Sequence, residues 1–169
     1  QNGGAAGIDG MQIEELGGWL SEHSQNLINE VLSEDYQPQS VLGVEIPKPN
    51  GGTRLLGIPT VVDRMLQQAI HEQLNKLYEP LFSERSYGFR PGRSALNAVG
   101  QSSEYIKSGY EWVVDLDLEN FFDTINHDRL MQRLSEKVKD KNLLSLIRKY
   151  LKTGVMSGGL VGAREKGTP

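Results

Sequence analysis

The sequence contains 169 residues, of which 37% are hydrophobic and 24% are charged, and its net charge is −4. This length supports one domain with a substantial core or two small lobes. No apolar run approaches the roughly 18 residues of a membrane-spanning helix and no signal peptide is recognisable, so we expect no membrane association. Cysteine is absent, which excludes disulfides and cysteine-ligated metals and fits a reducing compartment.

Charge is distributed unevenly along the chain. The first 43 residues include seven acidic residues and no Lys or Arg, whereas residues 44–169 include 18 basic and 15 acidic residues. The total charge argues against nucleic-acid binding, but residues 44–169 have a net charge of +3, so any surface that faces a polyanion is expected to be more basic than the total charge suggests. Composition alone favours the simpler interpretation of a solvated charged surface.

The first part of the chain predicts a loop and then a helix. Residues 3–10 are rich in turn formers, and Asp9 is expected to cap the helix that follows. A helical face of apolar residues continues beyond a break expected near Ser21. This face consists of Ile13, Leu16, Leu20, Leu27 and Val31.

Residues 41–47 and 53–59 are β-prone runs on either side of a turn that contains Asn50-Gly51. Asn-Gly between such runs predicts a β-hairpin. Lys48 and Arg54 flank the turn, and two cations at the tip of a mobile hairpin can clamp a triphosphate. Spacing alone favours the alternative, an edge hairpin kept soluble by its charge.

Two further helices are predicted after the hairpin. Thr60 and Asp63 resemble a capping box at the start of a long helix that Pro80 closes. Ser94 caps a second helix, which ends near Gly109. The apolar face of the long helix consists of Leu66, Ile70, Leu74, Leu77 and Leu81.

The loop between these helices contains Arg90 and Arg93 close to Tyr87 and Phe89. The guanidinium groups suit phosphate contacts or stacking on an unpaired base. A structural loop, with the two aromatic residues anchored in the core, is an equally good interpretation.

Residues 112–118 form a β-rich apolar run and predict a central strand. Asp115 and Asp117 would then point to the same face, where two carboxylates must be solvated, paired or metal-bound. Phe121 and Phe122 follow at once. A carboxylate that holds Mg²⁺ close to an aromatic ring suits a nucleotide, because the metal binds the phosphates while the ring packs on the sugar.

The last part of the sequence predicts two helices and a small hairpin. Asn126 or Asp128 opens the first helix, and His127 between them is interpreted as part of this cap rather than as a metal ligand. Asp140 opens the second helix, which ends at Gly154. Residues 155–161 are expected to form the hairpin.

Four stretches, in this order, resemble reverse transcriptases encoded by bacterial group II introns. Gly7-Ile-Asp-Gly10 resembles the N-terminal extension loop of that family, and residues 46–59 resemble its first fingers block. Residues 86–93 resemble the second block, and residues 114–127 resemble the third, which contains the first catalytic aspartate. The resemblance covers nearly the whole chain, and four blocks in order are highly specific.

The resemblance implies roles at the active site. Asp117 matches the catalytic, metal-binding aspartate, and the backbone carbonyl of Leu118 would be a second ligand in a two-Mg²⁺ site. Phe122 matches the aromatic residue that screens the 2′-hydroxyl of the incoming nucleotide, with Phe121 as the alternative. Asp115 is not required by the family pattern.

Further roles concern substrates. Lys48 and Arg54 match the fingers residues that hold the triphosphate of the dNTP. Contacts to nucleic acid are expected at Arg90, Arg93, Arg64, Gly7 and Ile8.

The expected fold is α+β, with a right-hand polymerase-like fingers lobe of helices and a β-hairpin at 1–111 and an incomplete palm at 112–169. In the family, Gly167-Thr-Pro169 continues into a Gln-Gly-Gly stretch and later a Tyr-Ala-Asp-Asp-type turn with the other two aspartates. We therefore expect a chain that is inactive alone, as part of an RNA-directed DNA polymerase of a mobile intron.

The expected partners are intron RNA as template, a DNA primer and dNTPs, in the bacterial cytoplasm, with splicing assistance as a further role. Because a partial palm exposes apolar surface, we also expect homodimers or aggregation. The alternative function is a non-catalytic, maturase-type module that binds intron RNA or assists assembly.

Overall fold

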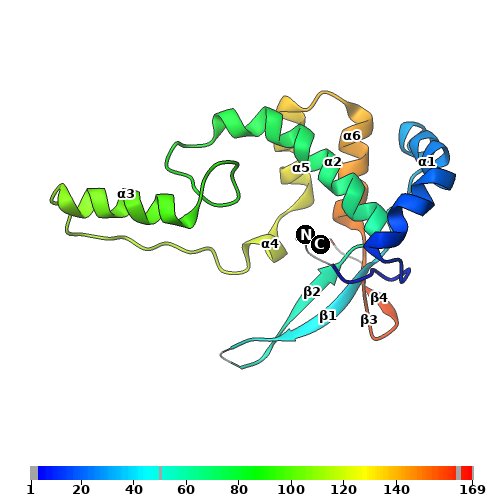
Figure 1. The fold of residues 1–169 in the computed structure, drawn as a ribbon, viewed down its shortest axis with the longest axis horizontal. Helices are drawn as coiled ribbons and strands as arrows, with labels where there is room; N and C mark the ends of the chain where they lie inside the picture. The colour runs from blue at the N-terminus through cyan, green and yellow to red at the C-terminus, as the bar shows by residue number, and fades with distance from the viewer. Residues whose placement is uncertain (1–3, 50, 163–164, 169) are drawn as a thin grey trace. The chain divides into compact units, whose positions relative to one another are not determined.

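A computed structural model describes residues 4–49, 51–162 and 165–168 (Figure 1). The predicted loop, hairpin turn and final block include Gly3, Asn50 and Pro169, which lie outside the described residues. None of the described helices is long and apolar enough to cross a membrane.

The chain begins with a short 3-10 helix, η1 (Ile13–Glu15), which leads directly into α1 (Leu16–Leu32). The prediction that Asp9 caps this helix is wrong: Asp9 accepts a hydrogen bond from the Met11 amide, and the N-cap is Gln12. The predicted break near Ser21 is also wrong. The Ser21 hydroxyl donates to the Gly17 carbonyl at 3.0 Å, so its polar group is satisfied within a continuous helix.

Four strands form one sheet in the order β2-β1-β3-β4. The antiparallel hairpin of β1 (Val41–Pro47) and β2 (Thr53–Ile58) confirms the first predicted hairpin. The second hairpin, β3 (Val155–Ser157) and β4 (Leu160–Gly162), is confirmed as well. Parallel pairing of β1 with β3 joins the two hairpins, a contact that the sequence did not predict.

The predicted helices in the middle of the chain are present. α2 (Val61–Tyr78) is followed by a 3-10 turn, η2 (Glu79–Leu81), and α3 (Ala95–Lys107) begins at its N-cap, Ser94. Gly109 follows α3 with φ +91°, the left-handed conformation that ends many helices.

The strand predicted at residues 112–118 is wrong: this segment is not paired with any described strand, and every residue in it is exposed. Trp112, Val114 and Leu116 are 93%, 82% and 88% exposed, respectively. β-prone residues form a stable strand only when a neighbour satisfies their backbone groups, and the described residues provide none here.

Three helices follow: α4 (Phe121–Thr124), α5 (His127–Lys137) and α6 (Lys141–Lys152). The N-caps of α5 and α6 are Asn126 and Asp140, as predicted, and their side chains accept hydrogen bonds from amides of the first helical turn.

The described core lies between α1, α2 and α6. Leu27, Tyr36, Val62 and Tyr150 are its buried members. Asp63 is fully buried at the start of α2, where it accepts hydrogen bonds from the Tyr36 and Tyr150 hydroxyls.

Contacts divide the chain into two compact units, one of residues 1–70 with 120–169 and the other of residues 71–119. α2 contributes residues to both.

Candidate functional site

Lys48 and Arg54 lie near the tip of the β1–β2 hairpin. The Lys48 amide donates to the Gly52 carbonyl at 3.0 Å, and Arg54 is paired with Ile46 in the ladder. Gly51 has φ +87°, so the turn uses a conformation that L-residues rarely adopt. Both cationic side chains are exposed, and within residues 4–49, 51–162 and 165–168 neither has an ion-pair partner.

The N-terminal loop packs against the start of α2. A Cβ added to Gly7 would lie 2.6 Å from the Thr60 Cα, so only glycine permits this close approach. Arg64 donates from Nη2 to the Ala5 carbonyl at 3.0 Å. Gly7 is buried and Ile8 is half-buried, so the described contacts of this loop are with the protein itself.

Arg90 is held inside its own loop. Its Nε and Nη2 donate to Oε1 of Glu79 at 3.0 and 2.8 Å, and Nη1 donates to the Ser83 and Ser86 carbonyls. The side chain is 8% exposed. Phe89 has φ +55° and is fully exposed. The alternative in which Tyr87 and Phe89 anchor the loop in the core is therefore wrong for Phe89, whereas Tyr87 is half-buried. The buried side chain of this loop is that of Arg90.

Arg93 is half-buried. Its guanidinium carbon lies 5.6 Å from the centre of the Tyr87 ring, and Nη1 donates to the Glu84 carbonyl. Both residues border a cavity of about 540 Å³ beside the first turns of α3. Its lining includes the basic Arg93 and the acidic Glu104.

Asp117 and Leu118 lie in the extended segment before α4. Oδ1 of Asp117 accepts a hydrogen bond from the Leu118 amide at 2.9 Å, and both residues are exposed. No three His, Asp or Glu side chains gather into a metal site among the described residues. One carboxylate and one carbonyl do not make a two-metal site, so the described residues alone do not fit a pair of Mg²⁺ ions.

Phe121 and Phe122 form the first turn of α4. Their ring centroids lie 5.4 Å apart in an edge-to-face arrangement, and the side chains are 47% and 67% exposed. Asn120, just before them, has φ +50°, in the left-handed region. The rings thus remain available to a ligand.

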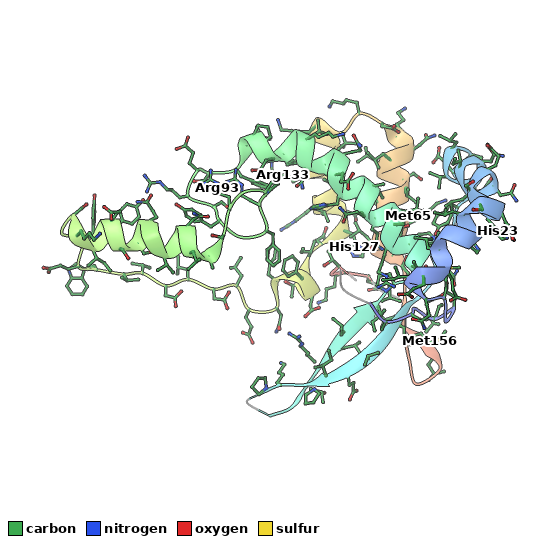
Figure 2. The ribbon with its side chains drawn as sticks, viewed as in Figure 1. His23, Met65, Arg93, His127, Arg133 and Met156 are labelled. Carbon is green, nitrogen blue, oxygen red and sulfur yellow. The ribbon has the colours of Figure 1, made fainter. Side chains whose placement is uncertain are left out.

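One basic surface was missed by the motif-based interpretation. Residues 126–153, which contain α5 and α6, include eight Lys or Arg and three acidic residues in a chain with net charge −4. Arg133 lies on α5 (Figure 2) and its side chain is 81% exposed. A count of charge over short windows, rather than over residues 1–43 and 44–169, would have found this surface. Its exposed basic residues are Arg129, Arg133, Lys137, Lys139, Lys141 and Lys152. Arg148 and Lys149 are half-buried and donate hydrogen bonds to Asp128 and to the Glu34 and Tyr36 carbonyls, respectively.

Comparison with known proteins finds a family whose model covers most of the chain. The family model "Reverse transcriptase (RNA-dependent DNA polymerase)" matches residues 46–169, more than half of the chain. The chain is 36% identical over 167 residues to Protein YkfC of Escherichia coli, covering 96% of this chain and 44% of that protein. It is 33% identical over 165 residues to the group II intron-encoded protein LtrA of Lactococcus lactis, covering 97% of this chain and 27% of that protein.

A more distant relative is the nuclear intron maturase 2 of Arabidopsis thaliana, 28% identical over 178 residues, covering 92% of this chain and 24% of that protein. The chain therefore spans less than half the length of these relatives. Together with the family match, the mixed α and β fold and the group II intron-encoded relatives lead to one assignment. This chain belongs to the reverse transcriptase family.

Proposed function

We propose that this chain forms the fingers and the first part of the palm of a group II intron reverse transcriptase. The observation that carries the proposal is the family match across residues 46–169, which includes Lys48, Arg54, Asp117 and Phe122. In the whole protein, Mg²⁺ would stabilise the attacking and leaving oxygens of nucleotidyl transfer. Asp117 would supply one carboxylate ligand and Leu118 a carbonyl.

The exposed cations Lys48 and Arg54 are proposed to hold the triphosphate of the dNTP. Lys provides a point charge and Arg a planar fork, and both are uncommitted to described acidic partners. Phe122 would then pack on the sugar of the same nucleotide. RNA template and DNA primer are the proposed nucleic-acid partners, with Arg93 as a contact, in the bacterial cytoplasm.

The test is Mg²⁺-dependent primer extension on an RNA template. It uses a longer version of the chain that continues into the Gln-Gly-Gly block, the paired-aspartate turn and a thumb. Wild type should extend the primer, and Asp117→Asn should reduce the rate by at least about 10³-fold. Asp115→Asn is the matched control on the same segment and should retain activity.

Equal loss in the Asp115 and Asp117 variants would contradict the assignment of the metal ligand. The 169-residue chain itself should show no extension, because Asp117 alone does not bind two metal ions. Robust synthesis by that chain would contradict this expectation.

A second candidate, a maturase-type RNA-binding module, is favoured by the basic surface of α5 and α6. Exposed Lys and Arg on adjacent helices suit the phosphate backbone of structured RNA without base-specific contacts. The two functions can coexist in one protein. Salt-dependent RNA binding by the longer version of the chain, without primer extension, would favour the module over the polymerase.

A further inference from the structure

The short helix α4 cannot be stable by itself. It has four residues, Phe121–Thr124, and a single helical turn does not offset the entropy of forming it. It nevertheless carries Phe121 and Phe122 with their side chains exposed. Whatever fixes the backbone of α4 therefore fixes the direction of these two rings.

Support for α4 comes from residues 165–168, near the end of the described chain. The Thr168 amide donates to the Phe122 carbonyl at 2.9 Å, and the Gly167 amide donates to the Ile125 carbonyl at 2.8 Å. Asn126 and Lys166 form an isolated antiparallel bridge. Through these bonds, residues 166–168 run alongside residues 122–126.

Gly167 makes this approach sterically possible. Its φ is +82°, and a Cβ at this position would lie 2.8 Å from the carbonyl oxygen of Asp123. Any other L-residue would meet both backbone strain and a clash with the backbone of α4. The contact between residues 165–168 and α4 therefore requires glycine at position 167.

His127, the first residue of α5, also contacts Gly167. His127 is 6% exposed, and Nε2 of its ring lies 2.6 Å from the Gly167 carbonyl oxygen. A carbonyl oxygen only accepts, so Nε2 carries the proton and donates. α5 is itself anchored by its Asn126 cap and by the buried Met131, so His127 (Figure 2) extends from a fixed element.

We propose that His127 is a positioning residue that holds Gly167 against α4 and thereby sets the orientation of the Phe122 ring. The proposed role of Phe122 at the nucleotide sugar makes His127 a determinant of sugar discrimination. This last step rests on the proposed function, whereas the positioning of the ring does not.

The first experiment tests the positioning in the 169-residue chain without catalysis. Fluorophenylalanine labelling gives four ¹⁹F signals, because the sequence has four Phe residues, and Phe122→Leu identifies one of them. His127→Leu should shift or broaden the Phe122 signal and speed amide exchange of Gly167 and Thr168 about tenfold. His127→Gln places an N–H donor at a similar reach and should restore both readouts.

Gly167→Ala disrupts the same contact between residues 165–168 and α4, here by a change in residues 165–168. It should reproduce the effect of His127→Leu. Gly159→Ala is its matched control, because Gly159 also has positive φ, +81°, with nothing within 4 Å of an added Cβ. His71→Leu, at an exposed position on α2, controls for the loss of a histidine.

The second experiment uses the longer, active polymerase and compares kcat/KM for dNTPs and for the corresponding ribonucleotides. A general structural defect lowers both values of kcat/KM alike. A misoriented Phe122 instead lowers the ratio of kcat/KM for dNTPs to kcat/KM for ribonucleotides. His127→Leu should narrow the ratio about tenfold, and His127→Gln should preserve it.

An unchanged Phe122 signal and unchanged exchange in His127→Leu would overturn the positioning role. A shifted signal with an unchanged ratio would overturn the role in sugar discrimination. If the longer wild-type protein does not synthesise DNA, the proposed function fails, and the ¹⁹F and exchange measurements still decide whether His127 positions Phe122.

Discussion

The hydroxyl of Tyr36 donates a hydrogen bond of 2.7 Å to Oδ1 of Asp63, and neither side chain is open to solvent. The same oxygen accepts from the Tyr150 hydroxyl at 3.0 Å, while Oδ2 accepts from the Thr60 hydroxyl at 2.8 Å. Asp63 also lies in the first turn of α2, where the helix dipole favours a negative charge. A buried carboxylate thus ties α2 to α6 and to the segment after α1.

Replacing this carboxylate should be costly. Asp63→Ala leaves two buried tyrosine hydroxyls and the Thr60 hydroxyl without their acceptor, and we expect the free energy of unfolding to fall by about 3 kcal/mol. Urea denaturation measures the change. Glu22→Ala, at an exposed position on α1, is the control and should change stability by less than about 0.5 kcal/mol. Similar stability of the two variants would contradict the structural role of Asp63.

The same cluster predicts a loss of stability at alkaline pH. Burial, together with the negative charge of Asp63, raises the pKa of Tyr36 and of Tyr150 well above the usual value of 10.0. Below pH 10 both phenols are protonated in the folded and unfolded states, so their hydrogen bonds to Asp63 contribute fully to the free energy of unfolding. As pH rises above 10, only the unfolded state releases these protons, and stability falls by up to about 1.4 kcal/mol per pH unit for each tyrosine.

Denaturation between pH 9 and pH 12 checks this slope. The double variant Tyr36→Phe with Tyr150→Phe should be less stable at pH 8 but should show a flatter decline above pH 10. Tyr110→Phe is the exposed control. An equal decline in wild type and the double variant would rule out these two phenols as its cause.

Arg90 is predicted to be a structural residue of its loop. Arg90→Ala removes the ion-pair partner of Glu79 and the donors to three carbonyls, so we expect the local free energy of unfolding to fall by about 2 kcal/mol. Arg90→Lys should not rescue it, because a single ammonium does not reproduce the fork. Amide exchange of residues 83–90 measures the effect, with Arg54→Ala as an exposed control. RNA binding that falls without any change in exchange would instead support a direct contact.

The basic surface of α5 and α6 predicts salt-dependent RNA binding. Changing Lys137 and Lys141 to Gln should reduce the magnitude of the slope of log K against log salt by about 1.5, if each contacts one phosphate. The control changes Lys76 and Lys107 to Gln, at two exposed positions of residues 71–119. Titration of a labelled structured RNA at several salt concentrations separates the variants. Equal slopes for the two double variants would place the contacts elsewhere.

The exposed apolar segment 112–118 predicts self-association of the 169-residue chain. Trp112 and Val114 are 93% and 82% exposed, more apolar surface than a monomer usually leaves in one stretch. Trp112→Ser with Val114→Ser should shift sedimentation profiles from dimers and larger species toward monomer. Leu160→Ser, at another exposed apolar position, is the control. A monodisperse wild-type monomer at high concentration would contradict the prediction.

Local features of the fold were predictable because their causes are local. Asn126, Asp140 and Ser94 cap helices as expected, since a short polar side chain satisfies the amides of the next turn. Turn formers between β-prone runs located both hairpins, including the one at 155–162.

Features that depend on distant partners were not predictable. The run 112–118 has strand propensity, but pairing decides whether a strand forms, and propensity does not supply a partner. The parallel contact of Val41 with Val155 joins segments far apart in the chain. The burial of Arg90 was also not predictable from the sequence, because its acceptor Glu79 lies in a different element.

Prediction of the candidate site was limited in the same way by contacts between residues far apart in sequence. Motifs identified Lys48, Arg54, Asp117 and Phe122 as candidates, but the role of His127 depends on Gly167, which is forty residues away in sequence. The sequence placed His127 correctly at a helix start and gave no indication of what its ring would contact.

The pairing of β1 with β3 has a consequence for synthesis on the ribosome. Val41 leaves the exit tunnel well before Val155, its neighbour in the sheet, and Tyr36 and Asp63 likewise precede Tyr150. At typical translation speeds of about 5–20 residues per second, the first hairpin waits several seconds for its partner strand. During this interval one edge of β1 and part of the core are open, so the nascent chain is expected to be a chaperone client until α6 and β3 emerge.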